Sequence, residues 1–347
     1  MIEVRNLTKQ YGDHIAVDNI SFTIEDGRIY GFLGPNGAGK STTMNIITGC
    51  LAATSGTVTI NGYDIYSQPK EAKRCIGFLP ELPPVYLDMT PREYLKFVGE
   101  AKGIKKADLP AAIEEAMQKA GIVEMQNRLI RHLSKGYRQR VGIAQAIIGA
   151  PQVIILDEPT VGLDPLQIIE VRDLIRDLGK DHTVILSSHI LSEVAAVCDM
   201  IIIISHGKLV AADTPENLSK MLQASNVLHL SVMGTEEQVR EVLGSLEGVQ
   251  KLEVSAGEDG ALDVHLTSDE SIDLRETVFA TCAKANLPLL NMQLERISLE
   301  DVFLQLTSGE APEKALEGEF GMQAEPAESA GSEQAAEEPQ AEKEDAE

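Results

Sequence analysis

The chain has 347 residues, 43% of them hydrophobic, and a formal net charge of −24 at pH 7. This length allows about two domains, and the acidic balance disfavours nucleic acid as a partner, because a grip on its phosphates rests on Lys and Arg. No run approaches the ~18 consecutive apolar residues of a membrane-crossing helix, and residues 1–12 contain no apolar signal region. We therefore expect a globular, cytoplasmic protein.

The cysteines and histidines show no metal-binding pattern. Cys50, Cys75, Cys198 and Cys282 have no C-x-x-C spacing, and the seven histidines form no paired-ligand spacing. We expect four reduced thiols that serve mostly in packing.

Residues 28–42 combine a short apolar strand with a phosphate-binding loop. "RIYGFLG" predicts the strand, and "GPNGAGKST" fits the G-x-x-x-x-G-K-[ST] pattern, with a helix predicted from Lys40. In this pattern the glycines let backbone N–H groups approach phosphate oxygens, Lys40 reaches the β- and γ-phosphates, and Ser41 offers a hydroxyl to Mg²⁺. A plain glycine-rich turn would need neither the strand nor the helix. The predicted nucleotide-binding residues of this loop are Gly34, Pro35, Asn36, Gly37, Ala38, Gly39, Lys40, Ser41 and Thr42.

A helical insert is predicted between Glu81 and His132, where the strand pattern stops. Thr90, Pro91 and Glu93 take the N-cap, first-turn and third positions of a capping box, so a helix should begin at this point. A second helix, "LPAAIEEAMQKAG", should end at Gly121.

Three further apolar strands follow the insert. "QVIILDEPT" ends in Asp157 and Glu158, "HTVILSS" leads to His189, and "MIIIIS" begins at Met200. Continuous apolar strands interleaved with helices indicate a mainly parallel sheet covered on both faces, so the fold class is α/β. In P-loop enzymes an Asp at a strand's carboxyl end holds Mg²⁺ through water, and the next acidic residue can orient and deprotonate the attacking water. An acidic strand terminus before Pro159 is the simpler alternative.

The pattern restarts after about residue 225 and reads β-α-β-β-α-β, the order of a ferredoxin-like α+β unit. This segment carries no convincing catalytic cluster, and a packing or dimerisation role is favoured over ligand sensing. From Ser308 onward, 13 acidic residues stand against two lysines in a stretch rich in Ala, Pro, Gly and Ser. Such a composition cannot bury enough apolar area to fold, which predicts a disordered acidic tail.

Four motifs in this order, "GPNGAGKST", "LSKGYRQRVGIAQAI", "ILDEPTVGLDP" and "SSHIL", resemble the nucleotide-binding subunit of an ATP-binding cassette (ABC) transporter. The resemblance covers roughly residues 1 to 215. Two other stretches, "CIGFLPELPPVYLDMTPREYL" and "ISLEDVFLQLT", are similar to the branch whose ATPase is a separate polypeptide paired with an ABC-2 type permease that usually exports.

The resemblance implies a head-to-tail dimer that holds two ATP molecules. In this family the signature segment, with Ser134, Gly136 and Gln139 here, faces the nucleotide held by the phosphate loop of a second copy. The residues are compatible with this, because Ser134 can cap the following helix and point its positive end at an anion. Residues 128–140 also carry five cationic side chains and no carboxylate, although an ordinary solvated helix start would explain Arg128 and Arg131 as well.

Further roles are implied residue by residue. Tyr11 resembles the aromatic that stacks on adenine, although it could equally be a turn residue beside Gly12. His189 resembles the switch histidine that contacts the γ-phosphate and holds the attacking water. Asp164 resembles the residue that links the two sites across the dimer. Together with Glu158 and Lys40, His189 completes the predicted catalytic set.

Two departures from the family pattern concern the signature and the metal site. The usual L-S-G-G-Q appears as "LSKGYRQ", with Lys135 and Tyr137 as replacements. Glu81 stands where most members have a glutamine that touches Mg²⁺ and senses the membrane subunit. The implied Mg²⁺ contacts are therefore Ser41, Asp157 and Glu81, and Glu81 and Asp164 are the implied coupling residues.

The sequence thus predicts an ATPase subunit that binds ATP and Mg²⁺ and powers a separate permease from the inner face of the membrane. The predicted domains are residues 1–220 with a helical subdomain at about 82–150, then 225–307, then the tail 308–347. Two alternatives stay open, namely a soluble ABC-type ATPase acting on ribosomes or DNA, and a regulatory protein with ATP as a structural ligand. The first usually has two cassettes or a long coiled coil, and the second lacks hydrolytic residues.

Overall fold

The computed structural model describes residues 1–221, 225–257, 260–269, 272–295 and 303. The predicted acidic tail, residues 308–347, lies outside the described residues, and so does most of the "ISLEDVFLQLT" stretch. Within the described part of the chain, no helix has the length and apolar character needed to cross a membrane.

A six-stranded sheet forms the centre of the α/β part. All its neighbouring strands pair in parallel except the edge strand β10, which pairs with β9 in the antiparallel sense. This confirms the mainly parallel sheet predicted from the continuous apolar runs. In spatial order the strands are β10 (Lys208–Asp213), β9 (Met200–Ser205), β3 (Ile29–Leu33), β8 (Thr183–Ser188), β7 (Val153–Leu156) and β6 (Ile76–Leu79).

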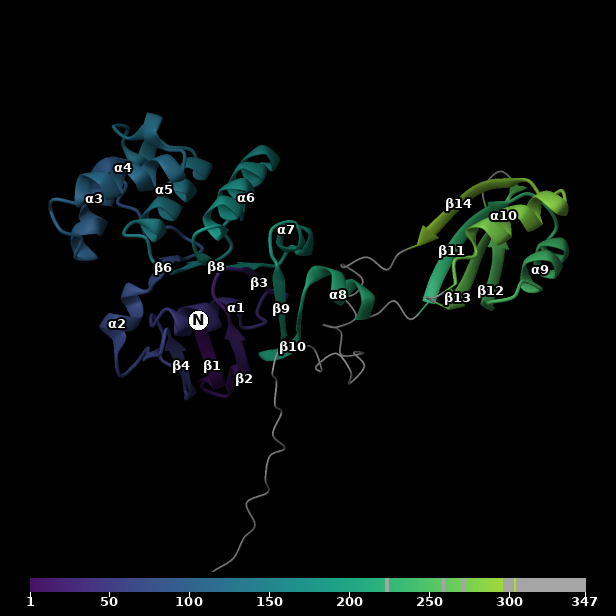
Figure 1. The fold of residues 1–347 in the computed structure, drawn as a ribbon, viewed down its shortest axis with the longest axis horizontal. Helices are drawn as coiled ribbons and strands as arrows, with labels where there is room; N and C mark the ends of the chain where they lie inside the picture. The colour runs from purple at the N-terminus through teal and green to yellow at the C-terminus, as the bar shows by residue number, and fades with distance from the viewer. Residues whose placement is uncertain (222–224, 258–259, 270–271, 296–302, 304–347) are drawn as a thin grey trace, which may run out of the picture.

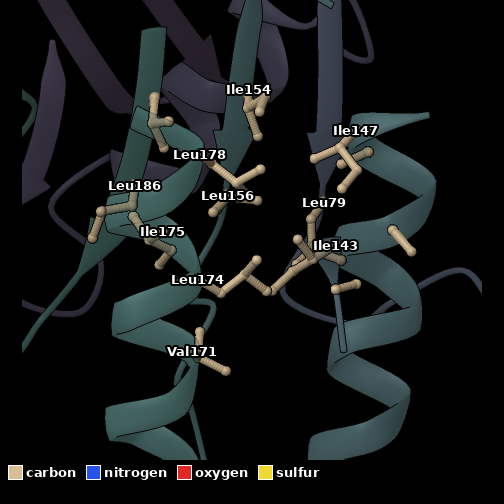
Figure 2. Close-up of a cluster of buried hydrophobic side chains, with 14 of the residues drawn as sticks. Leu79, Ile143, Ile147, Ile154, Leu156, Val171, Leu174, Ile175, Leu178 and Leu186 are labelled. Carbon is tan, nitrogen blue, oxygen red and sulfur yellow. The ribbon is translucent and has the colours of Figure 1, made fainter. Parts of the chain in front are cut away.

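The strands are apolar throughout because both faces of this sheet are buried. Along β9, Ile201 and Ile203 join one hydrophobic cluster while Ile202 and Ile204 join the other. On the first face lie α5 (Lys135–Ile147), α6 (Pro165–Gly179) and α7 (Leu191–Ala195), above the sheet in Figure 1. Figure 2 shows leucine and isoleucine side chains of α5 and α6 meeting those of the strands between them.

The second face is covered by α1 (Lys40–Ile47) and by a smaller antiparallel sheet, which lie below the central sheet in Figure 1. This sheet was not predicted from the sequence. Its order is β2-β1-β4-β5, where the long strands are β1 (Ile2–Tyr11) and β2 (His14–Ile24) and the shorter ones are β4 (Ser55–Ile60) and β5 (Tyr63–Asp64). A short helix, α2 (Pro69–Arg74), leads from it to β6.

The predicted helical insert is present between β6 and β7. It contains α3 (Pro91–Ala101) and α4 (Leu109–Lys119), two single 3₁₀ turns (Val123–Met125 and Ile130–His132), and α5. The capping box is formed as expected: Thr90 Oγ1 accepts from the Glu93 N–H, and the Glu93 side chain accepts from the Thr90 N–H. Lys102 donates to three carbonyls at the end of α5, each at 3.1 Å, which joins α3 to the signature helix.

After α8 (Pro215–Met221), the chain forms a four-stranded antiparallel sheet in the order β12-β13-β11-β14. This is the ferredoxin-like arrangement predicted from the element order. Its elements are β11 (Ser225–Val232), α9 (Glu236–Gly244), β12 (Val249–Ala256), β13 (Leu262–Asp269), α10 (Arg275–Lys284) and β14 (Leu289–Glu295). The unit has its own hydrophobic cluster. Phe303 instead packs against the cluster on the helix-covered face of the central sheet, and the predicted domain limits stay predictions.

The carboxyl ends of the parallel strands bring the predicted motifs to one edge of the sheet. The phosphate loop follows β3, Glu81 follows β6, Asp157 follows β7 and His189 follows β8. Ligands of open α/β sheets bind at this edge, because every strand-to-helix loop begins there.

Candidate functional site: a phosphate loop facing two carboxylates and a histidine

The loop between β3 and α1 has the backbone that close approach to phosphate requires. Gly37 and Gly39 have φ values of 80° and 105°, a region that favours glycine. At Gly39 a Cβ would also overlap the Ala16 carbonyl oxygen, so no other residue fits this N-cap without displacing β2. A loop of this conformation at the start of α1 is suited to bind an anion through its N–H groups.

Lys40 lies at the centre of this loop and is 6% exposed. Its Nζ donates to the Gly34 carbonyl at 2.7 Å and to the Pro35 carbonyl at 3.3 Å, and it lies 3.7 Å from Glu158 Oε1. Burial lowers the pKa of Lys40, while the carboxylates of Glu158 and Asp157 raise it in opposition. The ammonium is thus held beside the carboxylate that follows β7.

Asp157 and Ser41 meet across the base of the same site. Ser41 Oγ donates to Asp157 Oδ1 at 3.1 Å, and the Ser187 hydroxyl donates to the same oxygen at 2.6 Å. Asp157 is buried, and hydroxyl groups from two different elements orient its carboxylate. This arrangement places two hard oxygen donors side by side next to the phosphate loop.

Glu158 adopts an unusual backbone conformation that turns its side chain into the site. Its φ is +48°, a value uncommon for a residue with a Cβ and found often at functional sites. The Glu158 N–H donates to Ser187 Oγ at 2.8 Å, which helps to hold this conformation. The Oε2 atom lies 3.0 Å from Nδ1 of His189, whose side chain is 38% exposed. The ring is therefore fixed on its Glu158 side and open on the other.

Lys40, Ser41, Glu158 and His189 line one cavity of about 380 Å³, whereas Asp157 is not among its lining residues. The cavity brings together residues of the phosphate loop with Tyr11, Glu81, Glu158 and His189, all of them predicted from the sequence. His14, Ala16 and Val161 also line it and were not predicted. The lining residues are Tyr11, His14, Ala16, Asn36, Gly37, Gly39, Lys40, Ser41, Thr42, Glu81, Glu158, Val161 and His189.

The side chain of Tyr11 is well exposed at the rim of the cavity. It ends β1, directly opposite His14 in the strand pairing, and Lys9 Nζ lies 5.0 Å from the centre of its ring. Its exposed ring could stack on a base, as the resemblance implies, and its place at the β1–β2 turn also fits the alternative interpretation as a turn residue.

The signature segment lies away from this cavity, at the start of α5. Ser134 is exposed and caps the helix, with its Oγ accepting from the Tyr137 N–H at 3.3 Å. Gln139, in contrast, is 4% exposed and its Nε2 has no hydrogen-bond partner among the described residues. It lies one helical turn after the buried Gly136, on the side of α5 that faces the protein. The contacts of Gly136 and Gln139 with a partner's nucleotide stay predictions.

The residues that depart from the family signature contact their own chain. Tyr137 donates its hydroxyl to Glu124, and this hydrogen bond raises the pKa of Tyr137. The end of the Lys135 side chain lies against Gly162, where any Cβ would overlap it. Asp164 caps α6 by accepting from the Gln167 N–H at 2.9 Å.

The chain matches known proteins over nearly its whole described length. The ABC transporter family model matches residues 17–161. The linearmycin resistance ATP-binding protein LnrL of Bacillus subtilis (strain 168) is 32% identical over 308 residues, which cover 88% of this chain and 98% of the relative. The bacitracin transport ATP-binding protein BcrA of Bacillus licheniformis is 34% identical, over 89% of this chain and 98% of that protein.

This chain belongs to the ABC transporter family. A solved structure with a similar fold is the ATP-binding cassette MJ0796, dimeric in a post-hydrolysis state with ADP and Pi. It is 25% identical, has a TM-score of 0.56, and covers 62% of this chain and 98% of that one. The chain is thus an ATP-binding protein and an ATPase of this family, with relatives named for linearmycin resistance and bacitracin transport, which confirms the resemblance to the ABC family seen in the motifs.

Proposed function

We propose that this ABC ATPase binds ATP with Mg²⁺ in the 380 Å³ cavity, hydrolyses it between two copies of the chain, and thereby powers a separate membrane permease. One observation carries the catalytic part of the proposal: Lys40, Glu158 and His189 come from three different strand ends and converge on one cavity. A protein using ATP only as a structural ligand would not need Glu158 and His189 in contact.

The donor set fits Mg²⁺. This ion is usually held by one or two carboxylates together with substrate phosphates, at oxygen ligands. Ser41 and Asp157 supply such oxygens 3.1 Å apart, and Glu81 lines the same cavity. Within the described part of the chain, no three His, Cys, Asp or Glu side chains are grouped to hold a metal alone, which suits an ion that arrives with its nucleotide. When bound there, Mg²⁺ would neutralise charge on the phosphates.

Each residue of the site has a proposed part in hydrolysis. Lys40 exchanges its contacts with the Gly34 and Pro35 carbonyls for phosphate oxygens, and its charge stabilises the γ-phosphoryl group. Glu158 accepts a proton from the attacking water, as a carboxylate within hydrogen-bond reach of the site can do. His189, held on its Nδ1 side by Glu158, contacts the γ-phosphate with its other nitrogen.

The proposed dimer supplies the groups that this cavity lacks. Ser134 is exposed at the positive end of α5 and is not part of the cavity of its own chain. In a head-to-tail dimer it would face the nucleotide of the second copy, and the dimeric cassette with a similar fold supports this arrangement. Lys135, at the first position of α5, would add a cation on the same side.

A permease is proposed to dock beside Glu81, on the exposed apolar residues Leu82, Tyr86, Leu87 and Phe97. Tyr86 packs edge-on against Phe97, with ring centres 5.4 Å apart, so this surface is ordered and apolar. Leu82 is 81% exposed. Several exposed apolar residues that follow a nucleotide-site residue in the chain favour a protein partner, and the transport and resistance functions named for the relatives favour export. The site would then be cytoplasmic, on the inner face of the membrane.

The catalytic part is tested by ATP turnover of the purified chain and of Glu158→Gln. We expect the variant to bind ATP with wild-type affinity and to lose turnover by about 10²–10⁴-fold, the usual contribution of a general base. Unchanged turnover would remove Glu158 from this role.

The docking part is tested by co-purification with membranes. We expect the Phe97→Asp variant to be lost from the membrane fraction and to retain its basal ATPase rate. Phe279→Asp is the matched control, because Phe279 is an aromatic residue 60% exposed on α10. Equal retention of both variants on membranes would contradict a docking site beside Glu81.

A further inference from the structure

Side-chain hydrogen bonds join the segments that follow the last backbone pair of β7 and β8. The last paired residues of the two strands are Leu156 and Leu186. Beyond this pair, residues 157–160 carry Glu158 and residues 187–193 carry His189. Three separate side-chain contacts join the two segments.

The first contact is made by Ser187, which is fully buried. Its hydroxyl accepts from the Glu158 N–H at 2.8 Å and donates to Asp157 at 2.6 Å. The second contact is the Glu158–His189 pair at 3.0 Å. Both contacts involve Glu158, one of the proposed catalytic groups.

The third contact is a hydrogen bond from Thr160 Oγ1 to Glu193 Oε2. Thr160 lies two residues after Glu158, and Glu193 lies four residues after His189, on α7. Both side chains are buried, and neither lines the cavity. This contact therefore sets the spacing of the two segments from behind the site.

Burial of the Glu193 carboxylate lowers the stability of the folded chain. Glu193 is 6% exposed, and among the residues that the structure describes no Lys, Arg or His lies within ion-pair distance of it. Burying a carboxylate that has one neutral donor costs stability, and an apolar side chain of similar size is often at least as stabilising. A gain in stability does not explain this pair.

We infer that Thr160 and Glu193 are positioning residues for ATP hydrolysis: their hydrogen bond holds the segment of Glu158 and the segment of His189 in register. The inference rests on the proposed roles of Glu158 and His189. Because Thr160 is followed directly by Val161, which lines the cavity, and then by Gly162 and Asp164, the same bond ties the start of that loop to the histidine segment. Loss of the bond would let the two catalytic side chains drift apart without removing either of them.

The test uses isosteric pairs in the full chain. Thr160→Val and Glu193→Met remove the hydrogen bond, whereas Thr160→Ser and Glu193→Gln keep a donor and an acceptor at the same places. Thr183→Val is the matched control: Thr183 is a buried threonine at the other end of β8, where its hydroxyl accepts from the Gly27 N–H at 2.9 Å. For each variant, kcat and KM for ATP·Mg²⁺ and the melting temperature are measured.

We expect kcat to fall about 10- to 100-fold in Thr160→Val and in Glu193→Met. KM for ATP should stay within about twofold of wild type, because a small misplacement of Glu158 and His189 affects the chemical step more than nucleotide binding. The variant with both changes should be no slower than the slower single variant. Thr160→Ser and Glu193→Gln should retain most of the wild-type kcat, and Thr183→Val should lose melting temperature without losing kcat.

Two results would overturn the inference. One is a kcat in Thr160→Val that falls no further than in Thr183→Val at a similar loss of melting temperature. The other is a rise in KM that accounts for the whole loss, which would make the pair a support for binding. Failure of the proposed function is read separately, from turnover in Glu158→Gln.

Discussion

The Nδ1 atom of His189 lies 3.0 Å from the Oε2 atom of Glu158, and the two residues follow β8 and β7, which are neighbours in the central sheet. The same carboxylate has its other oxygen 3.7 Å from the Lys40 ammonium. Glu158 is therefore placed between the loop proposed to bind phosphate and the histidine proposed to contact the γ-phosphate. The geometry of hydrolysis depends on how the strand ends are held.

His189→Ala should reduce kcat by about 100-fold or more and leave KM for ATP within a few-fold of wild type. The loop proposed to bind the phosphates is intact in this variant, whereas the proposed donor to the γ-phosphate and the partner of Glu158 are lost. Steady-state ATPase kinetics measure both constants. A weaker KM with an unchanged kcat would mean that His189 only binds the nucleotide.

Gly162→Ala should lower the free energy of unfolding by about 1–2 kcal/mol, the usual cost of a left-handed conformation for a residue with a Cβ. Gly162 has a φ of +66°, and the end of the Lys135 side chain would have to move as well. Urea unfolding measures the change. Lys135→Ala in the same background should restore little of it, because a flexible side-chain end can shift at small cost.

Gly244→Ala is the matched control for Gly162→Ala. Gly244 has an ordinary helical backbone at the end of α9, and a Cβ there would meet Leu252 at a normal contact distance of 3.5 Å. This change should be neutral or stabilising by up to about 1 kcal/mol. Equal destabilisation by both changes would contradict the conformational argument at Gly162.

Thr90→Ala should destabilise the helical insert by about 1 kcal/mol, the typical value of an N-cap hydroxyl. The measurement is the free energy of unfolding at pH 7, and an unchanged value would show that the capping box of α3 adds nothing. Hydrogen bonds from the Thr90 N–H and hydroxyl also lower the pKa of Glu93 below its ordinary value.

The contribution of Glu93 to stability should decrease as the pH falls. Because its pKa is lower in the folded chain than in the unfolded one, its stabilisation is present above the unfolded value of about 4.3 and is lost as pH falls through the folded value. The stability difference between wild type and Glu93→Gln should therefore shrink as pH falls below about 4. A difference that grows in acid would contradict this assignment.

The parallel strands and the helix starts could be predicted from the sequence because their signals are local. Ile201 to Ile204 are apolar on both faces of β9, and Thr90 and Glu93 occupy both positions of the capping box. The start of the signature helix at Ser134 was recognisable for the same reason. Local chemistry determined each of these elements, and the tertiary structure agrees with it.

The antiparallel sheet of β1 and β2 was missed because bulges break its alternation. The pairing shifts register between Val4 and Leu7, and again near Lys9, while Asn6 and Asn19 have positive φ values. A period of two residues therefore does not persist long enough to be seen. His14 and Ala16 enter the cavity through this sheet, so they were missed with it.

Contacts between segments that lie far apart in the sequence could not be predicted either. Ser187 and the Thr160–Glu193 pair join residues about 30 positions apart, and the sequence shows only polar residues after apolar strands. The burial of Gln139, in contrast, could be read from the local sequence. Gln139 follows Gly136 by three residues, so helical periodicity places both on the same buried side of α5.

The central claim is that the signature segment of one copy contacts the nucleotide bound by the other. The most direct test is the molar mass in solution of the Glu158→Gln variant, measured with ATP·Mg²⁺ and with ADP. The account predicts a dimer with ATP only, and a monomer with either nucleotide when Ser134→Trp is added. Thr90→Trp is the control, because Thr90 caps α3 with the same 3.3 Å contact that Ser134 makes, and this variant should still dimerise. A dimer that persists with Ser134→Trp, or a monomer under every condition, would contradict the claim.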